Sequence, residues 1–179
     1  MVYLKTTRLV VRQAGLRDVP ALAFFQRKNR SFHRPFEPIR PEKFYTQRYW
    51  RNAVTNNQRS ARRQQNLLLH VFLGKKVIAL IAFNSISHGA FQSCDLGYML
   101  DKNSQGQGYM QEALKAAIQF MFNERGLHRI AAAHLLGNRR SEKLLTRLGF
   151  TRIGIAPKYL YIAGSWQDHV LRQRIRTGE

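Results

Sequence analysis

The segment from residue 93 to residue 124 constrains the fold more than any other part of this sequence. Residues 93–100 have the apolar, β-rich character of a strand, and residues 109–124 form the clearest amphipathic helix in the chain. Gly106 and Gly108 lie between these two elements. The apolar positions on one face of the helix are Met110, Ala113, Leu114, Ala117, Ile118 and Met121. The segment therefore predicts a strand, a glycine turn and a helix that packs on a sheet.

A glycine turn that leads into a helix is suited to bind an anion. Gly106 and Gly108 can adopt positive φ and bring backbone N–H groups close to a ligand, and the helix N-terminus adds partial positive charge. The same turn is equally compatible with a plain connection into the helix. A Rossmann dinucleotide site requires a third glycine where Gln111 stands, and the Gly-Lys-Ser/Thr of a Walker A loop is absent. A phosphate site here would be of a third kind.

Strands and helices follow one another along the rest of the chain. Asp18 is expected to cap a short helix, and Pro35, Pro38 and Pro41 predict a stiff loop after it. The other predicted elements are a strand at 4–13, helices at 19–30, 42–63 and 138–148, a hairpin with arms at 66–73 and 76–84, a strand at 128–136, and two short strands within 151–174. This order, without repeat or linker, predicts one mixed α/β domain.

Charge is the strongest compositional signal. Thirty Lys and Arg residues against ten Asp and Glu residues give a formal net charge of +20, and residues 1–63 contain fifteen of the thirty basic residues. Such a charge favours anionic partners: RNA, DNA, an acidic membrane or a polyphosphate ligand. The longest apolar run, residues 77–83, is too short to span a bilayer, and no secretory signal pattern is present. A single cysteine, Cys94, fits a cytoplasmic protein.

Several motifs together carry a resemblance to a known family. They are TTRLVVR and NRSFHRPFEPIRPE, then LGYMLDKNSQGQGYMQEALKAAIQFMF, GLHRIAAAHLLGNRRSEKLLTRLGF and GSWQDHVL. In this order they resemble the GNAT N-acetyltransferases, and within them the Rim-type enzymes that acetylate the N-termini of ribosomal proteins. The first two motifs resemble the branch that acetylates the N-terminal alanine of a small-subunit ribosomal protein.

The resemblance covers the whole chain and carries expectations about the fold. It implies an α/β (α+β) architecture in a single N-acetyltransferase domain, residues 1–179, with its core at about 5–175. The expected sheet is mixed, mostly antiparallel and twisted, with about six to seven strands, and about four helices flank it. These expectations agree with the alternation of elements read from the residues themselves.

The resemblance also names a co-substrate, acetyl-CoA, and assigns residues to it. Its pyrophosphate would lie on backbone amides of the glycine loop, and its pantetheine arm would lie along the preceding strand, where an N–H of Met99 or Leu100 would stabilise the oxyanion. Asn138 would contact pantetheine or act as a helix cap, and the two roles are compatible. The full set of expected cofactor-binding residues is Tyr98, Met99, Leu100, Gln105, Gly106, Gln107, Gly108, Tyr109, Met110 and Asn138. Asn103 departs from the family pattern, which has Arg or Gln there.

Transfer of an acyl group to an amine requires a neutral amine, a stabilised oxyanion and a proton for the departing thiolate. Ser141 is the candidate acid, with a second helix cap as the alternative, and Tyr109 and Tyr159 are weaker hydroxyl candidates. Glu37 is the first candidate base, and the alternative interpretation is a loop carboxylate that balances Arg34 or Arg40. Asp95 is a weaker candidate, which could simply be a charge at the edge of a strand.

Other chemistry-bearing residues have plainer interpretations. Glu112 and Asp168 are interpreted as structural, and Cys94 is predicted to be buried. The histidines are scattered without metal-ligand spacing, so no metal is predicted.

The predicted acceptor is a ribosomal-protein N-terminus. The basic N-terminal half is a candidate surface for contact with the ribosome or rRNA, and no membrane partner is expected. The alternatives are another peptide or small amine as acceptor, or a ribosome- or RNA-binding assembly factor with little catalysis. The sequence gives no indication of oligomeric state.

Overall fold

The computed structural model describes residues 1–177, which form one eight-stranded sheet in the order β1-β2-β3-β4-β5-β6-β8-β7. Only the β5–β6 pair is parallel, and the other neighbours are antiparallel. The strands are β1 (Tyr3–Lys5), β2 (Val10–Arg12), β3 (Leu67–Leu73), β4 (Lys76–Ser87), β5 (Ser93–Leu100), β6 (Arg129–Leu135), β7 (Thr151–Ile162) and β8 (Ser165–Ile175).

The sheet has eight strands, one more than the upper end of the predicted range of six to seven. The extra strand arises because the segment predicted as a single strand at 4–13 forms two strands. The N–H of Thr6 donates to the carbonyl of Leu9 at 2.9 Å. This turn reverses the chain between β1 and β2, which then pair with each other as antiparallel neighbours.

Four α-helices lie within the described residues, as predicted: α1 (Val19–His33), α2 (Gln47–Arg62), α3 (Tyr109–Asn123) and α4 (Arg139–Arg147). Helix α2 begins later than predicted. Its cap is Thr46, whose hydroxyl accepts from the N–H of Tyr49, and residues 42–45 form a separate 3₁₀ turn. The proline-rich loop likewise contains a short 3₁₀ turn at Arg34–Phe36. Asp18 precedes α1 but makes no side-chain cap bond, because its carboxylate binds Arg12.

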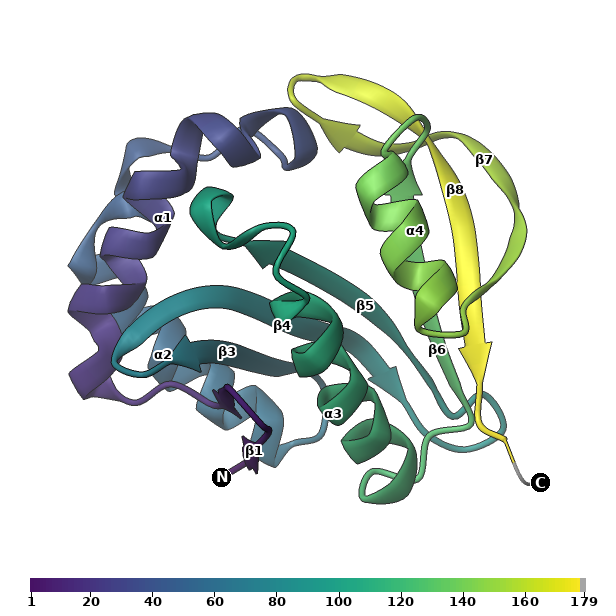
Figure 1. Ribbon diagram of the computed structural model, residues 1–179, viewed down its shortest axis with the longest axis horizontal. Coiled ribbons are helices and arrows are strands. Elements are labelled where there is room, and N and C mark those ends of the chain that lie inside the picture. Colours follow the sequence, from purple (N-terminus) through teal and green to yellow (C-terminus); the bar gives the residue numbers. More distant parts are fainter. Residues whose placement is uncertain (178–179) are drawn as a thin grey trace.

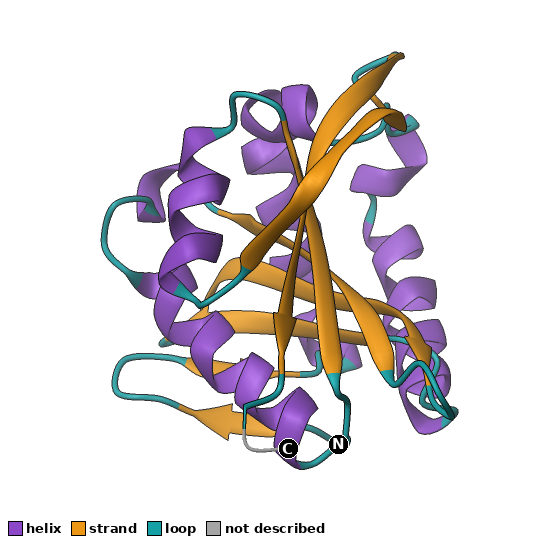
Figure 2. Ribbon diagram, turned by 90° about the vertical axis from the view of Figure 1, so that its right-hand side faces the viewer, coloured by secondary structure: helices purple, strands orange, loops and turns teal. Residues whose placement is uncertain are grey.

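Helices cover both faces of the sheet (Figure 2). Helices α3 and α4 pack on one face. The core there includes four side chains that are 0% exposed: Phe83, Leu114, Ile118 and Ile130. Helices α1 and α2 pack on the other face, where Leu22 and Trp50 belong to one buried cluster with Leu80 of β4. The predicted apolar face of α3 is buried over its whole length, so the pattern that defined the helix also seats it on the sheet.

The sheet is divided between β5 and β6. These two strands pair only from Ser93↔Arg129 to Leu96↔Ala132, although β6 continues to Leu135 and β5 to Leu100. Figure 1 shows the two strands together at the lower right and separating toward the top. Backbone groups of both strands are therefore left without a neighbouring strand in the opening, called here the β5–β6 gap.

The β7–β8 hairpin reaches the proline-rich loop across the top of the gap (Figure 1). The N–H of Ala163, at the hairpin turn, donates to the carbonyl of Glu37 at 3.1 Å. Both strands are longer than the short ones predicted, with 12 residues in β7 and 11 in β8, and two register shifts interrupt their pairing. The two sides of the gap thus meet again where the hairpin turn contacts the proline-rich loop.

Candidate functional site

The glycine loop has the backbone geometry that the sequence predicted. Gly106 has φ of 75° and Gly108 has φ of 77°, both left-handed, and α3 begins at the next residue. Within residues 1–177, the N–H groups of residues 105–110 have no protein acceptor, and the first helical bond runs from Glu112 to Gly108. Such a row of N–H groups at a helix N-terminus is an anion-binding arrangement.

Arg8 fixes the outer side of this loop. Its guanidinium donates to the carbonyl of Gln107 at 3.0 Å and stacks on the ring of Tyr109 at 4.6 Å. Glu112 holds Arg8 by an ion pair of 2.7 Å and also accepts from Thr6. Burial raises the pKa of Glu112, but these hydrogen bonds outweigh it and leave the pKa below its ordinary value. Glu112 thus ties the N-terminal segment to the first turn of α3.

Asp101 joins the loop to α1, a link that sequence reasoning missed. Its buried carboxylate accepts from the Lys28 ammonium at 2.8 Å and from the Asn29 side chain at 3.0 Å. Burial raises the pKa of Asp101, but the bonds from Lys28, Asn29 and Ser104 outweigh it and lower the pKa overall. Asn103, the residue that departs from the pattern of the resemblance, forms hydrogen bonds only through its backbone N–H and carbonyl. Its side chain is exposed and forms no hydrogen bond within residues 1–177.

The backbone of β5 faces the gap through alternate residues. Since the N–H of Asp101 donates to Ile78 of β4, the antiparallel alternation directs the N–H of Met99 toward β4 as well. The N–H groups of Tyr98 and Leu100 are then directed toward the gap. The Nε2 atom of His33, on α1, lies 2.9 Å from the carbonyl oxygen of Leu100, within hydrogen-bond distance. This is a second contact that sequence reasoning missed.

Two hydroxyl groups meet across the gap. The Oη of Tyr98 lies 2.6 Å from the Oγ of Ser141 on α4. Burial raises the pKa of Tyr98 to about 12, although the Ser141 hydrogen bond and the nearby Arg172 charge act in the opposite direction. Asn138 caps α4 by accepting from the N–H of Ser141 at 3.2 Å, as predicted for a cap. Ser141 therefore caps nothing with its hydroxyl, which points to Tyr98 instead.

The two carboxylates considered as bases lie in different places. Glu37 is buried in the proline-rich loop beside the hairpin turn, and its Oε2 accepts from Arg40 at 3.3 Å. Asp95 is exposed on β5, four residues before Met99, which is about 13 Å along an extended strand. The weaker hydroxyl candidate Tyr159 is exposed on β7 and lies beside His169, and Asp168 accepts from the N–H of Lys158.

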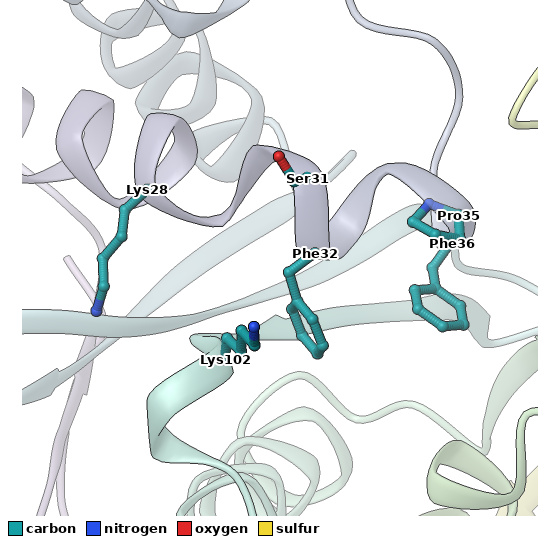
Figure 3. A pocket seen from close by; sticks show the side chains of 6 residues that line it. All are labelled: Lys28, Ser31, Phe32, Pro35, Phe36 and Lys102. Atoms are coloured by element: carbon teal, nitrogen blue, oxygen red, sulfur yellow. The ribbon is translucent and has the colours of Figure 1, made fainter.

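A groove of about 450 Å³ lies between the end of α1 and the segment before the glycine loop. Figure 3 shows the rings of Phe32 and Phe36 directed from α1 and its extension toward the side on which Lys102 lies. Arg140 of α4 stacks on both rings and donates to the side chain of Gln105 at 2.5 Å. This arginine links α4, α1 and the glycine loop.

A second groove, of about 350 Å³, lies on the α1–α2 face of the sheet and reaches Met99. We call it the α2 groove. Its walls combine aromatic, amide and aliphatic side chains, and Arg40, the partner of Glu37, is among the lining residues. The lining residues include Gln26, Phe44, Tyr49, Trp50, Ala53, Asn57, Asn66 and Asn84. The groove thus runs from α2 to the β5 strand at Met99.

Cys94 is buried, as predicted. Its side chain is 2% exposed, and burial together with the neighbouring Asp95 raises the pKa of the thiol to about 12. Among residues 1–177, no group of three or more His, Cys, Asp or Glu side chains is placed to hold a metal ion. None of the helices in that range is both long and apolar enough to cross a membrane.

Comparisons with known proteins agree with this geometry. Residues 8–151 match the family model described as an acetyltransferase (GNAT) domain. The chain is 38% identical over 172 residues to the ribosomal protein uS5-alanine N-acetyltransferase of Escherichia coli (strain K12). The aligned region covers 95% of this chain and 89% of that relative.

Solved structures give the same result. The ribosomal-protein-S5-alanine acetyltransferase of Vibrio fischeri is 32% identical, with a TM-score of 0.95 over 99% of this chain and 98% of that one. The RimJ protein of Mycobacterium smegmatis, solved in complex with CoA-disulfide, shares the fold with a TM-score of 0.90 at 23% identity, over 97% of this chain and 86% of that one. The chain therefore belongs to the GNAT acetyltransferase family and is an N-acetyltransferase of the Rim type.

Proposed function

We propose that the protein transfers the acetyl group of acetyl-CoA to the N-terminal alanine amine of a small-subunit ribosomal protein, by direct attack within a ternary complex. The observation that carries this proposal is the β5–β6 gap, which opens beside the unpaired N–H groups of the glycine loop. The acceptor is inferred from the E. coli relative, whose name states its substrate as ribosomal protein uS5.

Acetyl-CoA would bind from the glycine loop into the gap. Its pyrophosphate would accept from the N–H groups of Gln105, Gly106, Gln107, Gly108, Tyr109 and Met110. The pantetheine arm would lie between Asn138 and the strand from Tyr98 to Leu100. The Leu100 N–H is directed toward the gap by the β4–β5 hydrogen-bond pattern and is the preferred oxyanion donor. The Met99 side chain would face the acceptor in the α2 groove, which it lines.

The acceptor would approach from the α2 groove and the proline-rich loop. An α-amino group has a pKa of about 8, so removal of its proton requires only a mild base or a water chain that ends on a carboxylate. Glu37 is proposed as this base because it is buried beside Arg40, which lines the α2 groove. Asp95 is the second candidate, and its position on β5 would require several bridging waters.

Ser141 is proposed as the acid that protonates the departing thiolate. In the direct mechanism the neutral amine forms a bond to the acetyl carbon, and the nitrogen of the tetrahedral intermediate gives its extra proton to the base or to the water chain that ends on it. The intermediate then collapses and the C–S bond breaks. The Ser141 hydroxyl then gives its proton to the sulfur. The 2.6 Å contact to Tyr98 supplies a neighbouring hydroxyl that can return a proton to Ser141.

The test is release of free CoA thiol from acetyl-CoA in the presence of a short peptide that begins with alanine. We expect thiol release with that peptide and none with the same peptide carrying an acetylated N-terminus. Release with lysine or a small amine but not with the alanine peptide would assign another acceptor. No release with any amine would contradict the proposal. Mass spectrometry of ribosomal-protein N-termini, with and without the protein, then identifies the acceptor.

A further inference from the structure

Helix α2 carries a row of arginines that the proposed reaction does not use. Arg48, Arg51, Arg59 and Arg62 are spaced by 3, 8 and 3 residues, which places them on one side of a helix with 3.6 residues per turn. All four are exposed. The row spans about 21 Å from first to last at 1.5 Å per residue. We call it the α2 arginine row.

In the part of the chain that the structure describes, six of the ten acidic residues form ion pairs with cations outside α2. Carboxylates pair with Arg8, Arg12, Lys28, Arg30, Arg40 and Arg172. Between Glu42 and Asp95 the sequence contains no Asp or Glu at all. Among residues 1–177, the four side chains of the α2 arginine row form no ion pair and no hydrogen bond with another residue. The positive charge of this surface is therefore not neutralised by the protein.

The other sides of α2 are already occupied. Trp50, Val54 and Ala61 are buried against the sheet, so the helix has no free apolar face to insert into a lipid surface. Tyr49, Trp50, Ala53 and Asn57 line the α2 groove. An exposed cationic row without exposed apolar neighbours suits a ligand that presents regularly spaced charges, as a nucleic-acid backbone does.

We propose that the α2 arginine row binds the phosphate backbone of structured RNA. Guanidinium groups bind phosphate oxygens through paired donors, and contacts to phosphates and 2′-hydroxyls dominate the recognition of RNA helices. The choice of RNA among polyanions rests on the proposed function, since a ribosomal protein is surrounded by RNA. One helix then separates two sites, with the RNA on its outer side and the acceptor chain in the α2 groove.

The experiment compares two variants with the same change in net charge. The first replaces Arg48, Arg51, Arg59 and Arg62 by Gln. The control replaces four other exposed cations by Gln: Lys115, Arg147, Arg152 and Arg176, whose side chains form no ion pair or hydrogen bond within residues 1–177. Binding of a fluorescent RNA hairpin is titrated at several salt concentrations for wild type and both variants. Thermal unfolding and turnover of a free alanine peptide are measured alongside, so that loss of fold is separated from loss of RNA contacts.

The wild type is expected to bind the hairpin with strong salt dependence. Loss of four phosphate contacts should reduce the slope of log K against log salt by about 3. We expect the α2 variant to bind at least tenfold more weakly at about 0.1 M salt and the control variant to remain within about threefold of wild type.

Several results would overturn the proposal. They are equal weakening in both variants, absence of hairpin binding by the wild type, or tighter binding to anionic vesicles or duplex DNA than to RNA. Failure of the proposed function is distinguishable, because it would appear as absent peptide turnover in the wild type while the hairpin titration is unaffected.

Discussion

Between residues 93 and 96, β5 is paired with β6 along its backbone, and Cys94 and Leu96 are buried against Ile130 and its neighbours. From Gly97 onward the strands separate, and single polar contacts replace continuous packing. These contacts are Tyr98 to Ser141, Arg140 to Gln105, and Ala163 to Glu37. One end of the strand pair therefore holds the two halves of the molecule together, while the other end holds them apart.

The largest effect is expected at the paired end. Ile130→Ala removes most of a side chain with 0% exposure and should lower the free energy of unfolding by about 2 to 5 kcal/mol. Chemical denaturation measures this loss, and Ile130→Val, expected to cost about 1 kcal/mol, is the matched control. A loss below 1 kcal/mol for the alanine variant would mean that the paired end does not join the halves.

At the open end, Ser141→Ala should lower kcat about 100-fold, the size of a general-acid contribution. The cap of α4 should survive, since Asn138 bonds to the backbone N–H of Ser141, which alanine retains. Stability should therefore stay close to wild type in thermal unfolding. Full turnover in this variant would remove Ser141 from the mechanism.

Asp101→Asn tests the link between α1 and the glycine loop. It removes the charge that holds Lys28, and charge-assisted hydrogen bonds contribute about 1.5 to 3 kcal/mol. We expect the KM for acetyl-CoA to rise about tenfold, with kcat within about twofold. Steady-state kinetics at saturating peptide separates the two constants, and Lys28→Met should reproduce the change. A fall in kcat at constant KM would show that Asp101 acts on the chemistry instead of on cofactor binding.

The smallest effect is expected for Tyr98→Phe. Removal of one hydroxyl that bonds Ser141 should cost about 1 kcal/mol, which corresponds to about a fivefold fall in kcat. Combined with Ser141→Ala it should add nothing further, because the two hydroxyls act as a pair. Additive losses in the double variant would separate Tyr98 from Ser141.

The helices and the glycine turn could be predicted well from the sequence. Helix α3 was expected at 109–124 and runs over Tyr109–Asn123, because its apolar positions repeat with the helical period. The positive φ of Gly106 and Gly108 also followed from residue type. By contrast, the β1–β2 turn was missed, since apolar residues lie on both sides of it without a glycine or proline signal.

The contacts at the open end could not be predicted in the same way. His33 to Leu100 and Lys28 to Asp101 join residues separated by 67 and 73 positions. Neither pair has a local spacing that marks it, and each depends on how α1 lies over the end of β5. The meeting of Tyr98 and Ser141 likewise follows from the gap itself. Local periodicity thus predicts elements, whereas the site depends on the tertiary arrangement.

The burial of Cys94 has a practical consequence for observing this molecule. Because its only thiol is sealed in the core with a raised pKa of about 12, the native protein offers thiol reagents no exposed target. A cysteine introduced at an exposed position, such as Ser165 at the start of β8, would be the single site for a spectroscopic label. A second introduced cysteine at Ile39 would allow distances across the hairpin contact to be followed while co-substrate and acceptor bind.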